Sequence, residues 1–167
     1  MDSFDRIRDE IYRCRKCGSH YGNNAVGFGI QRNPLVMFIG INPWVKNHQF
    51  SDGRGIKKLK SFLALKKFTD FFFDNIIKCQ MPDPSKKPDL ENGMNCFNFI
   101  RRQVVFINPK NIILFGSLPS IIFDKHDTIF KSFKIIKFPH FSSIFYTDGM
   151  KEETYYRKLQ GILEDLK

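Results

Sequence analysis

The runs LVMFI at residues 35–39 and NIILF at residues 111–115 decide the fold, and each is followed by a glycine. Short unbroken apolar runs of this kind are typical of strands that are buried on both faces in a parallel sheet. Residues 71–78 and 133–138 predict two more strands. Because predicted helices separate all four, the sequence predicts an α/β fold of three layers, α/β/α, around a mostly parallel four-stranded central sheet.

The helices are predicted from apolar residues that recur every three or four positions. They cover the segment from Phe4 to about Cys14, the segment Ile56–Leu63, residues 89–107, a short stretch at 118–123 and a closing amphipathic helix from Tyr155 to Leu166. Ligands of such sheets bind beyond the carboxyl ends of the strands. We therefore expect functional residues in the loops at 40–55, 75–88, 116–120 and 138–150.

Length and charge bound the class of protein. The chain has 167 residues, so we expect a single domain over residues 1–167. Its formal net charge of +10 favours a polyanionic partner, nucleic acid first, although a Lys-rich composition alone also gives a basic surface. No apolar run is long enough to span a membrane, and the N-terminal segment lacks the apolar core of a signal peptide. We therefore expect a soluble, intracellular (cytoplasmic) monomer.

Four cysteines form the most distinctive pattern. Cys14 and Cys17 make a C-x2-C pair, and Cys79 and Cys96 follow far downstream. Intracellular proteins rarely keep such residues as disulfides, and four converging thiolates would hold Zn²⁺ or a [4Fe–4S] cluster. A zinc ribbon usually supplies two close pairs, so the wide second spacing favours the cluster. The alternative is four unrelated thiols, because cysteine is often buried as a small hydrophobe.

Six motifs, in this order, resemble those of the iron–sulfur uracil-DNA glycosylases, families 4 and 5. They are CRKC at 14–17, VMFIGINPW at 36–44, DNIIKC at 74–79, CFNF at 96–99, NIILFG at 111–116 and PHFS at 139–142. The resemblance spans residues 8–146 and implies a DNA-repair enzyme that acts on DNA containing uracil, with the four cysteines as ligands of a [4Fe–4S] cluster. The implied reaction hydrolyses the N-glycosidic bond of a base flipped out of the duplex and leaves an abasic site.

The first catalytic motif of this superfamily follows the first strand, and GINP at 40–43 resembles its mismatch-specific version. The resemblance implies that Asn42 orients a water molecule towards the sugar C1′ and that Gly40 and Ile41 belong to the substrate site. An amide can orient water but is not a strong base. Ile41 stands where the iron–sulfur families more often carry Glu. Without the other motifs, Asn42 followed by Pro would indicate a plain turn after a strand.

Three further residues resemble parts of the base-binding pocket. Phe50 matches the aromatic residue that stacks on the flipped pyrimidine, although a loop aromatic can also fill a core. Asn75 matches the amide that donates to uracil O4 and accepts from N3–H, a pattern that cytosine would not satisfy. Trp44 stands where the classical branch carries a Tyr that blocks the thymine methyl group, which implies a preference for uracil over thymine.

The PHFS segment resembles the second catalytic motif, which is normally His-Pro-Ser. The resemblance implies that His140 donates a hydrogen bond to uracil O2 and stabilises the departing base anion, with Ser142 beside it. Phe141 replaces the usual Pro, and the apolar residues 144–146 are candidates for the wedge that fills the gap left by a flipped base. The alternative for His140 is a structural hydrogen bond at a strand end.

Neither catalytic motif contains a Lys that could form a Schiff base, so the resemblance implies a monofunctional glycosylase. Two other functions stay open. The departures at Ile41 and Phe141 are compatible with a catalytically silent iron–sulfur protein that binds DNA or senses damage. A glycosylase for another deaminated base, hypoxanthine or the thymine of a T:G mismatch, is the second, because single residues shift pocket specificity in this superfamily.

Overall fold

A five-stranded sheet forms the centre of the molecule. The computed structural model describes residues 3–17, 24–43, 45–46, 49–50, 53–80, 88–145 and 151–167, and for residues 45, 46, 49, 50 and 127 it describes only the backbone. In spatial order the strands are β1 (Phe28–Gly29), β5 (Phe71–Asn75), β2 (Val36–Gly40), β6 (Asn111–Phe115) and β7 (Lys134–Phe138). β1 pairs antiparallel with β5, and the other pairings are parallel. The short strands β3 (Val45–Lys46) and β4 (Gln49–Phe50) form a separate hairpin.

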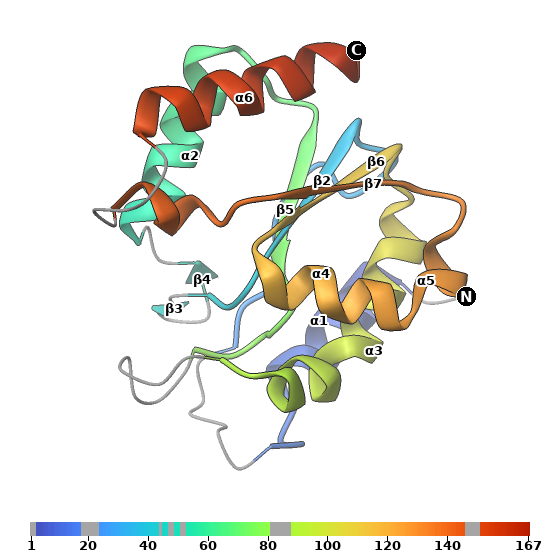
Figure 1. The fold of residues 1–167 in the computed structure, drawn as a ribbon. Coiled ribbons are helices and arrows are strands. Elements are labelled where there is room, and N and C mark those ends of the chain that lie inside the picture. The colour runs from blue at the N-terminus through green and yellow to red at the C-terminus, as the bar shows by residue number, and fades with distance from the viewer. Residues whose placement is uncertain are drawn as a thin grey trace.

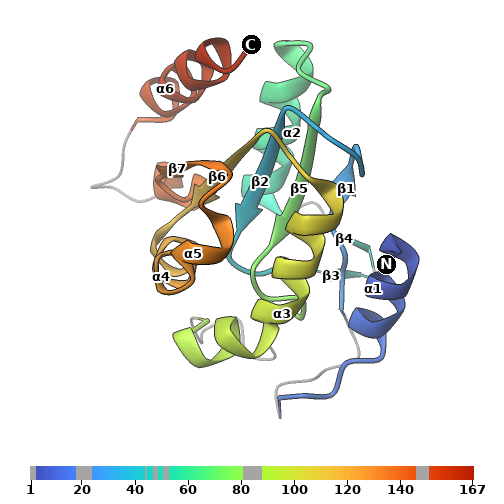
Figure 2. The same ribbon diagram turned by 90° about the vertical axis from the view of Figure 1, so that its right-hand side faces the viewer.

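Helices cover both faces of this sheet (Figures 1 and 2). The helices of the chain are α1 (Phe4–Tyr12), α2 (Arg54–Leu65), α3 (Leu90–Ile107), α4 (Ser117–Lys125), α5 (Asp127–Phe130), the 3-10 helix η1 (Phe141–Phe145) and α6 (Glu152–Asp165). One hydrophobic cluster joins the sheet to α1, α3 and α4, and a second cluster joins it to α2 and α6. The predicted three-layer α/β/α architecture is therefore confirmed.

Strand β2 shows why the central strands have unbroken apolar sequences. All five of its residues are buried. Met37 and Ile39 point into the cluster with α3, whereas Val36 and Phe38 point into the cluster with α2 and α6. Successive side chains of a strand point to opposite faces, so a strand that is covered on both faces must be apolar at every position.

The sheet has one strand more than the four that the sequence predicts. β1 lies at the edge and consists of Phe28 and Gly29. Gly29 has a φ of +120°, and a Cβ atom there would lie 2.3 Å from the carbonyl oxygen of Phe71. A strand of two residues that contains a required glycine produces no alternating apolar pattern, which is why the sequence did not indicate it.

Residues 76–78 do not extend β5, contrary to the prediction of a strand over residues 71–78. The amide of Ile76 donates to the carbonyl of Gly40, and the amide of Ile77 donates to the carbonyl of Ile41, both at 2.9 Å. These contacts lie in a turn beyond the last strand pair, Gly40 with Asn75. Burial in a turn and burial in a strand give the same apolar sequence. As a result, the loops that follow β2 and β5 are tied to each other.

None of the described helices combines the length and the apolar composition that a membrane-spanning helix needs.

Candidate active site

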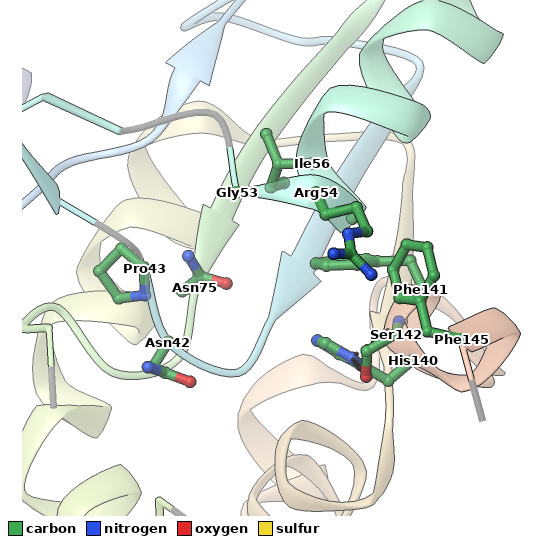
Figure 3. A pocket seen from close by; sticks show the side chains of 11 residues that line it. Asn42, Pro43, Gly53, Arg54, Ile56, Asn75, His140, Phe141, Ser142 and Phe145 are labelled. Atoms are coloured by element: carbon green, nitrogen blue, oxygen red, sulfur yellow. Dashed lines mark hydrogen bonds between the residues drawn. The ribbon is translucent and has the colours of Figure 1, made fainter. Parts of the chain in front are cut away.

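A cavity of about 290 Å³ lies where the chain leaves β2, β5 and β7. Asn42, Asn75 and His140 line it, each from a different one of these three exits, and Ser142 lines it beside His140. Figure 3 shows these side chains around one common space. Parallel strands deliver their carboxyl ends to the same edge of a sheet, so residues that are far apart in sequence meet there.

Asn75 is the most buried polar residue of the cavity wall. It ends β5, and only 2% of its surface is exposed. Its amide N–H donates to its neighbour Asp74 Oδ1 at 2.7 Å, which fixes the backbone. Gly40 faces it across the strand pair, and a Cβ atom at Gly40 would lie 2.3 Å from Asn75 Oδ1. The glycine at position 40 therefore leaves the space in which the Asn75 carboxamide sits.

His140 is fixed in one tautomer by its own loop. The backbone N–H of Ser142 donates to His140 Nδ1 at 3.2 Å, and Ser142 Oγ lies 2.7 Å from the same nitrogen. Nδ1 is therefore the acceptor, and the proton of the neutral ring belongs on Nε2. Burial lowers the pKa of His140 from 6.5 to about 4, so the ring is neutral at physiological pH. The cavity thus receives an uncharged N–H donor.

Three contacts hold the His140 loop in place. The hydroxyl of Tyr155 on α6 donates to the carbonyl of Pro139 at 2.9 Å. The amide of Gly116, which has a φ of +94°, donates to the carbonyl of Phe138, also at 2.9 Å. Phe141 buries its ring against α2, where a Cβ atom at Gly55 would lie only 2.3 Å from it. The Phe that replaces the expected Pro therefore anchors the loop to the apolar core.

Asn42 lies in the loop after β2 and is half-buried. No described residue is hydrogen-bonded to its carboxamide, which leaves the amide available to a ligand or water in the cavity. Its neighbour Pro43 is buried and also lines the cavity. A neutral imidazole donor, two carboxamides and a buried wall are suited to binding an uncharged planar molecule with polar edges.

The four cysteines lie in one region on the side of α1 and α3. Cys14 and Cys17 follow α1, Cys79 follows the turn after β5, and Cys96 lies on α3. They form no disulfide. The pKa of the Cys79 thiol is raised to about 12, chiefly by burial and also by the other three thiols, because all four are close in space.

As donors, four sulfur atoms suit an iron–sulfur cluster or zinc. Within the described part of the chain, however, no three His, Cys, Asp or Glu side chains are near enough to one another to hold a metal ion. The thiols therefore converge on one region without reaching ligand spacing.

A family model described as the uracil DNA glycosylase superfamily matches residues 26–167, which is most of the chain. The chain belongs to this superfamily. A relative named type-4 uracil-DNA glycosylase, from Archaeoglobus fulgidus, is 26% identical over 179 residues, covering 92% of this chain and 88% of that protein. Proteins of the same name from Sulfurisphaera tokodaii and Saccharolobus solfataricus are 28% and 29% identical, covering 70% of this chain and 56% of each relative.

The fold also matches a solved structure. The crystal structure of wild-type SMUG2 from Pedobacter heparinus superposes with a TM-score of 0.58 at 14% sequence identity, covering 81% of this chain and 76% of that one. The family model and the type-4 relatives confirm the resemblance to the superfamily that six motifs indicated, whereas the mismatch-specific version of the GINP motif stays a prediction.

The structure gathers most of the residues that the superfamily motifs indicated. Gly40 and Ile41 stand behind the cavity: Gly40 makes room for Asn75, and Ile41 packs into the apolar cluster on the α3 side. Trp44 and the side chain of Phe50 lie outside the described residues.

The cavity is also lined by four residues at the start of α2 that the sequence did not indicate as binding residues: Gly53, Arg54, Gly55 and Ile56. Of the described residues 144 and 145, Phe145 lines it. Ile144 packs into the core instead, and Tyr146 lies outside the described residues. Arg54 falls within the segment 40–55, where functional residues were expected, but it belongs to none of the six motifs.

Proposed function

We propose that this member of the superfamily is a monofunctional uracil-DNA glycosylase, which hydrolyses the N-glycosidic bond of uracil in DNA and leaves an abasic site. The observation that carries the proposal is the meeting of Asn42, Asn75 and His140 around one cavity. Its volume of about 290 Å³ is at the lower limit of small-molecule sites, roughly 300 Å³, which suits a single base. The type-4 relatives carry the same activity in their names.

Base recognition is assigned to Asn75. A carboxamide can donate to uracil O4 and accept from N3–H at the same time, while cytosine presents the opposite pattern at both atoms. Because Asn75 is buried, a wrong base would leave its polar atoms unpaired, which is costly. The duplex must release the base for this contact to form, so the target nucleotide flips into the cavity.

Bond cleavage is assigned to His140 and Asn42. As the glycosidic bond breaks, the bonding electrons leave with the base, and negative charge develops on uracil O2. The neutral Nε2–H of His140 donates to that oxygen and stabilises the anion. The Asn42 carboxamide orients the water that attacks the sugar C1′. As the new C–O bond forms, the proton of the water is released to solvent, from which the departed uracil anion takes one up.

The cysteines are proposed to hold a [4Fe–4S] cluster, with Zn²⁺ as the alternative. Cys14, Cys17, Cys79 and Cys96 would hold it, and bound there it would tie α1 to α3 and to the turn after β5. Iron and acid-labile sulfide content of protein purified without oxygen tests the assignment. Iron and sulfide that disappear in Cys96→Ser support the cluster, whereas bound zinc without sulfide supports the alternative.

The decisive experiment compares wild type with Asn42→Ala on labelled oligonucleotides that carry U:G, U:A, single-stranded U, T:G or hypoxanthine, followed by alkali. Cleavage at uracil alone, largely lost in Asn42→Ala, is the expected result. Cleavage only at hypoxanthine or T:G would reassign the lesion. If every substrate stays intact while wild type still shifts the DNA in a gel, the proposed activity is wrong and the protein is a catalytically silent DNA-binding protein.

A further inference from the structure

Arg54 is the only side chain with a permanent charge among the described residues that line the cavity. The other polar members of the wall are neutral: Asn42, Asn75, Ser142 and the uncharged imidazole of His140. Arg54 is the first residue of α2 and is exposed, so it stands at the mouth of the cavity rather than in its depth. Figure 3 shows its guanidinium on the side of Phe141 and Phe145.

The Arg54 guanidinium contacts an aromatic ring, and no described carboxylate forms an ion pair with it. Its central carbon lies 5.4 Å from the centre of the Phe145 ring. Lys58, one turn further along α2, lies over the same ring, but its ammonium forms an ion pair with Glu152 of α6. No described carboxylate pairs with Arg54 in this way. Lys58 is thus neutralised within the protein, whereas the described structure leaves the charge of Arg54 available to a ligand.

We propose that Arg54 binds a phosphate oxygen of the DNA strand beside the flipped nucleotide. This rests on the proposed function, since it takes the occupant of the cavity to be a nucleotide of DNA. A phosphodiester carries its charge in every state of the reaction, and a planar guanidinium matches its oxygens with two parallel N–H donors. The neutral polar groups of the cavity wall suit the uncharged base. The cavity therefore matches a nucleotide: Arg54 at its mouth faces the anionic phosphate, and the neutral wall faces the uncharged base.

The test measures binding without cleavage. The probe is a duplex with one tetrahydrofuran abasic analogue opposite G, titrated at several KCl concentrations with wild type, Arg54→Gln and Lys66→Gln. Lys66 follows the opposite end of α2, so its variant removes the same charge away from the cavity. We expect Arg54→Gln to bind about tenfold more weakly at low salt and to reduce the slope of log K against log [KCl] by about one. Lys66→Gln should change both by much less, and Arg54→Lys should restore part of the slope.

A second measurement separates phosphate binding from an action on the departing base. The rate of single-turnover cleavage at saturating protein should fall less in Arg54→Gln than its affinity for DNA does, because saturation compensates for weaker binding. If the single-turnover rate falls while binding and its salt slope stay unchanged, and 5-fluorouracil, a better leaving group, recovers the rate, Arg54 acts on the base and the proposal is wrong. Equal slopes for Arg54→Gln and Lys66→Gln would also overturn it. If wild type cleaves no uracil while the slopes still differ, the proposed activity fails but the phosphate contact stands.

Discussion

At the scale of single residues, the cavity keeps its histidine neutral. A nearby carboxylate would raise the pKa of an imidazole and charge it, yet the described lining residues include none. Burial instead lowers the pKa of His140, and the amide of Ser142 leaves Nε2 as the protonated nitrogen. The ring can therefore donate a hydrogen bond at neutral pH without first taking up a proton.

The lowered pKa of His140 predicts a dependence of stability on pH. In the unfolded chain the ring takes up a proton near pH 6.5, but in the folded protein it does so only near 4. Its contribution to stability is therefore complete above about pH 6.5 and is lost as the pH falls towards 4. Urea unfolding at about pH 7.5, 6 and 5 should show a larger loss for wild type than for His140→Gln, which has no group to protonate. Parallel losses in the two proteins would contradict this environment for His140.

Gly40 is predicted to act on recognition through the space that it leaves. A methyl group at position 40 would lie 2.3 Å from Asn75 Oδ1, so Gly40→Ala must displace the carboxamide. We expect kcat/KM on uracil to fall by about tenfold or more, the effect of losing one buried hydrogen-bonding group.

Gly93→Ala is the matched control, because its methyl group would meet Ile122 Cδ1 at 2.2 Å in the apolar core of α3 and α4. That change should lower stability by about 1–3 kcal/mol and leave the activity of the folded fraction unchanged. A similar loss of activity in both variants would mean that general overpacking, and not Asn75, is responsible.

Sequence patterns indicated the three central residues because each belongs to a motif beside a strand end. Asn42 follows the glycine of β2, Asn75 ends β5, and His140 follows β7. Arg54 has no such neighbour pattern, since an Arg at the start of an amphipathic helix is ordinary. Its role depends on where Phe145 and the cavity lie, and only the folded chain brings them together.

At the scale of elements, the turn after β5 is built around a buried ion pair. Asp74 and Lys78 are 0% and 1% exposed, and Lys78 Nζ lies 2.9 Å from Asp74 Oδ2. The same ammonium donates to the carbonyl of Asn75 at 2.7 Å. The pair therefore holds the backbone of Asn75 from both sides, since Asp74 also accepts from its amide.

Removing one partner of this pair is predicted to cost more than removing both charges. Lys78→Met leaves a buried carboxylate without its cation, which costs about 3–5 kcal/mol. In the double variant Asp74→Asn with Lys78→Met no charge is left unpaired, while the carboxamide introduced at position 74 can still accept from the amide of Asn75. We expect the double variant to be more stable than Lys78→Met in urea unfolding. A double variant whose loss equals the sum of the two single losses would show that the charges do not interact.

The elements themselves were largely predictable, and the misplaced end of β5 has a physical cause. The strand over residues 111–115 is confirmed, because a buried parallel strand leaves an unbroken apolar run. The end of β5 is wrong by three residues, because Ile76 and Ile77 are equally buried in the turn that follows. Burial determines apolar sequence, and the partner of each backbone amide determines strand geometry. Only the first of these is visible in a sequence.

At the scale of the whole molecule, the N-terminal helix is attached to the sheet from one side. Ile7 and Ile11 of α1 pack against Phe99 of α3, and Arg102 of α3 pairs with Glu10, with Nη2 at 3.0 Å from Oε1. Cys14 and Cys17 follow the first of these helices, and Cys96 lies on the second. A cluster bound by them would therefore add to an existing apolar contact between α1 and α3.

Loss of the proposed cluster is predicted to loosen this end of the molecule first. Arg13, Arg15 and Lys16 surround Cys14, so trypsin reports on the segment. After iron is removed with a chelator, cleavage at these residues should accelerate well before cleavage within α3, because the thiols would no longer hold the segment. Mass spectrometry of the first fragments checks the order. Unchanged cleavage after complete loss of iron would mean that apolar packing alone holds α1.

The backbone bonds from Ile76 to Gly40 and from Ile77 to Ile41 also constrain how this pocket can diversify. They connect the segment that carries Asn42 to the turn that follows Asn75, so an insertion or deletion in either segment would displace both side-chain amides at once. Exchange of individual side chains leaves these backbone hydrogen bonds intact. New substrate preferences in descendants of this chain should therefore arise by point substitution around an unchanged backbone, while changes in loop length are confined to the cavity's other walls.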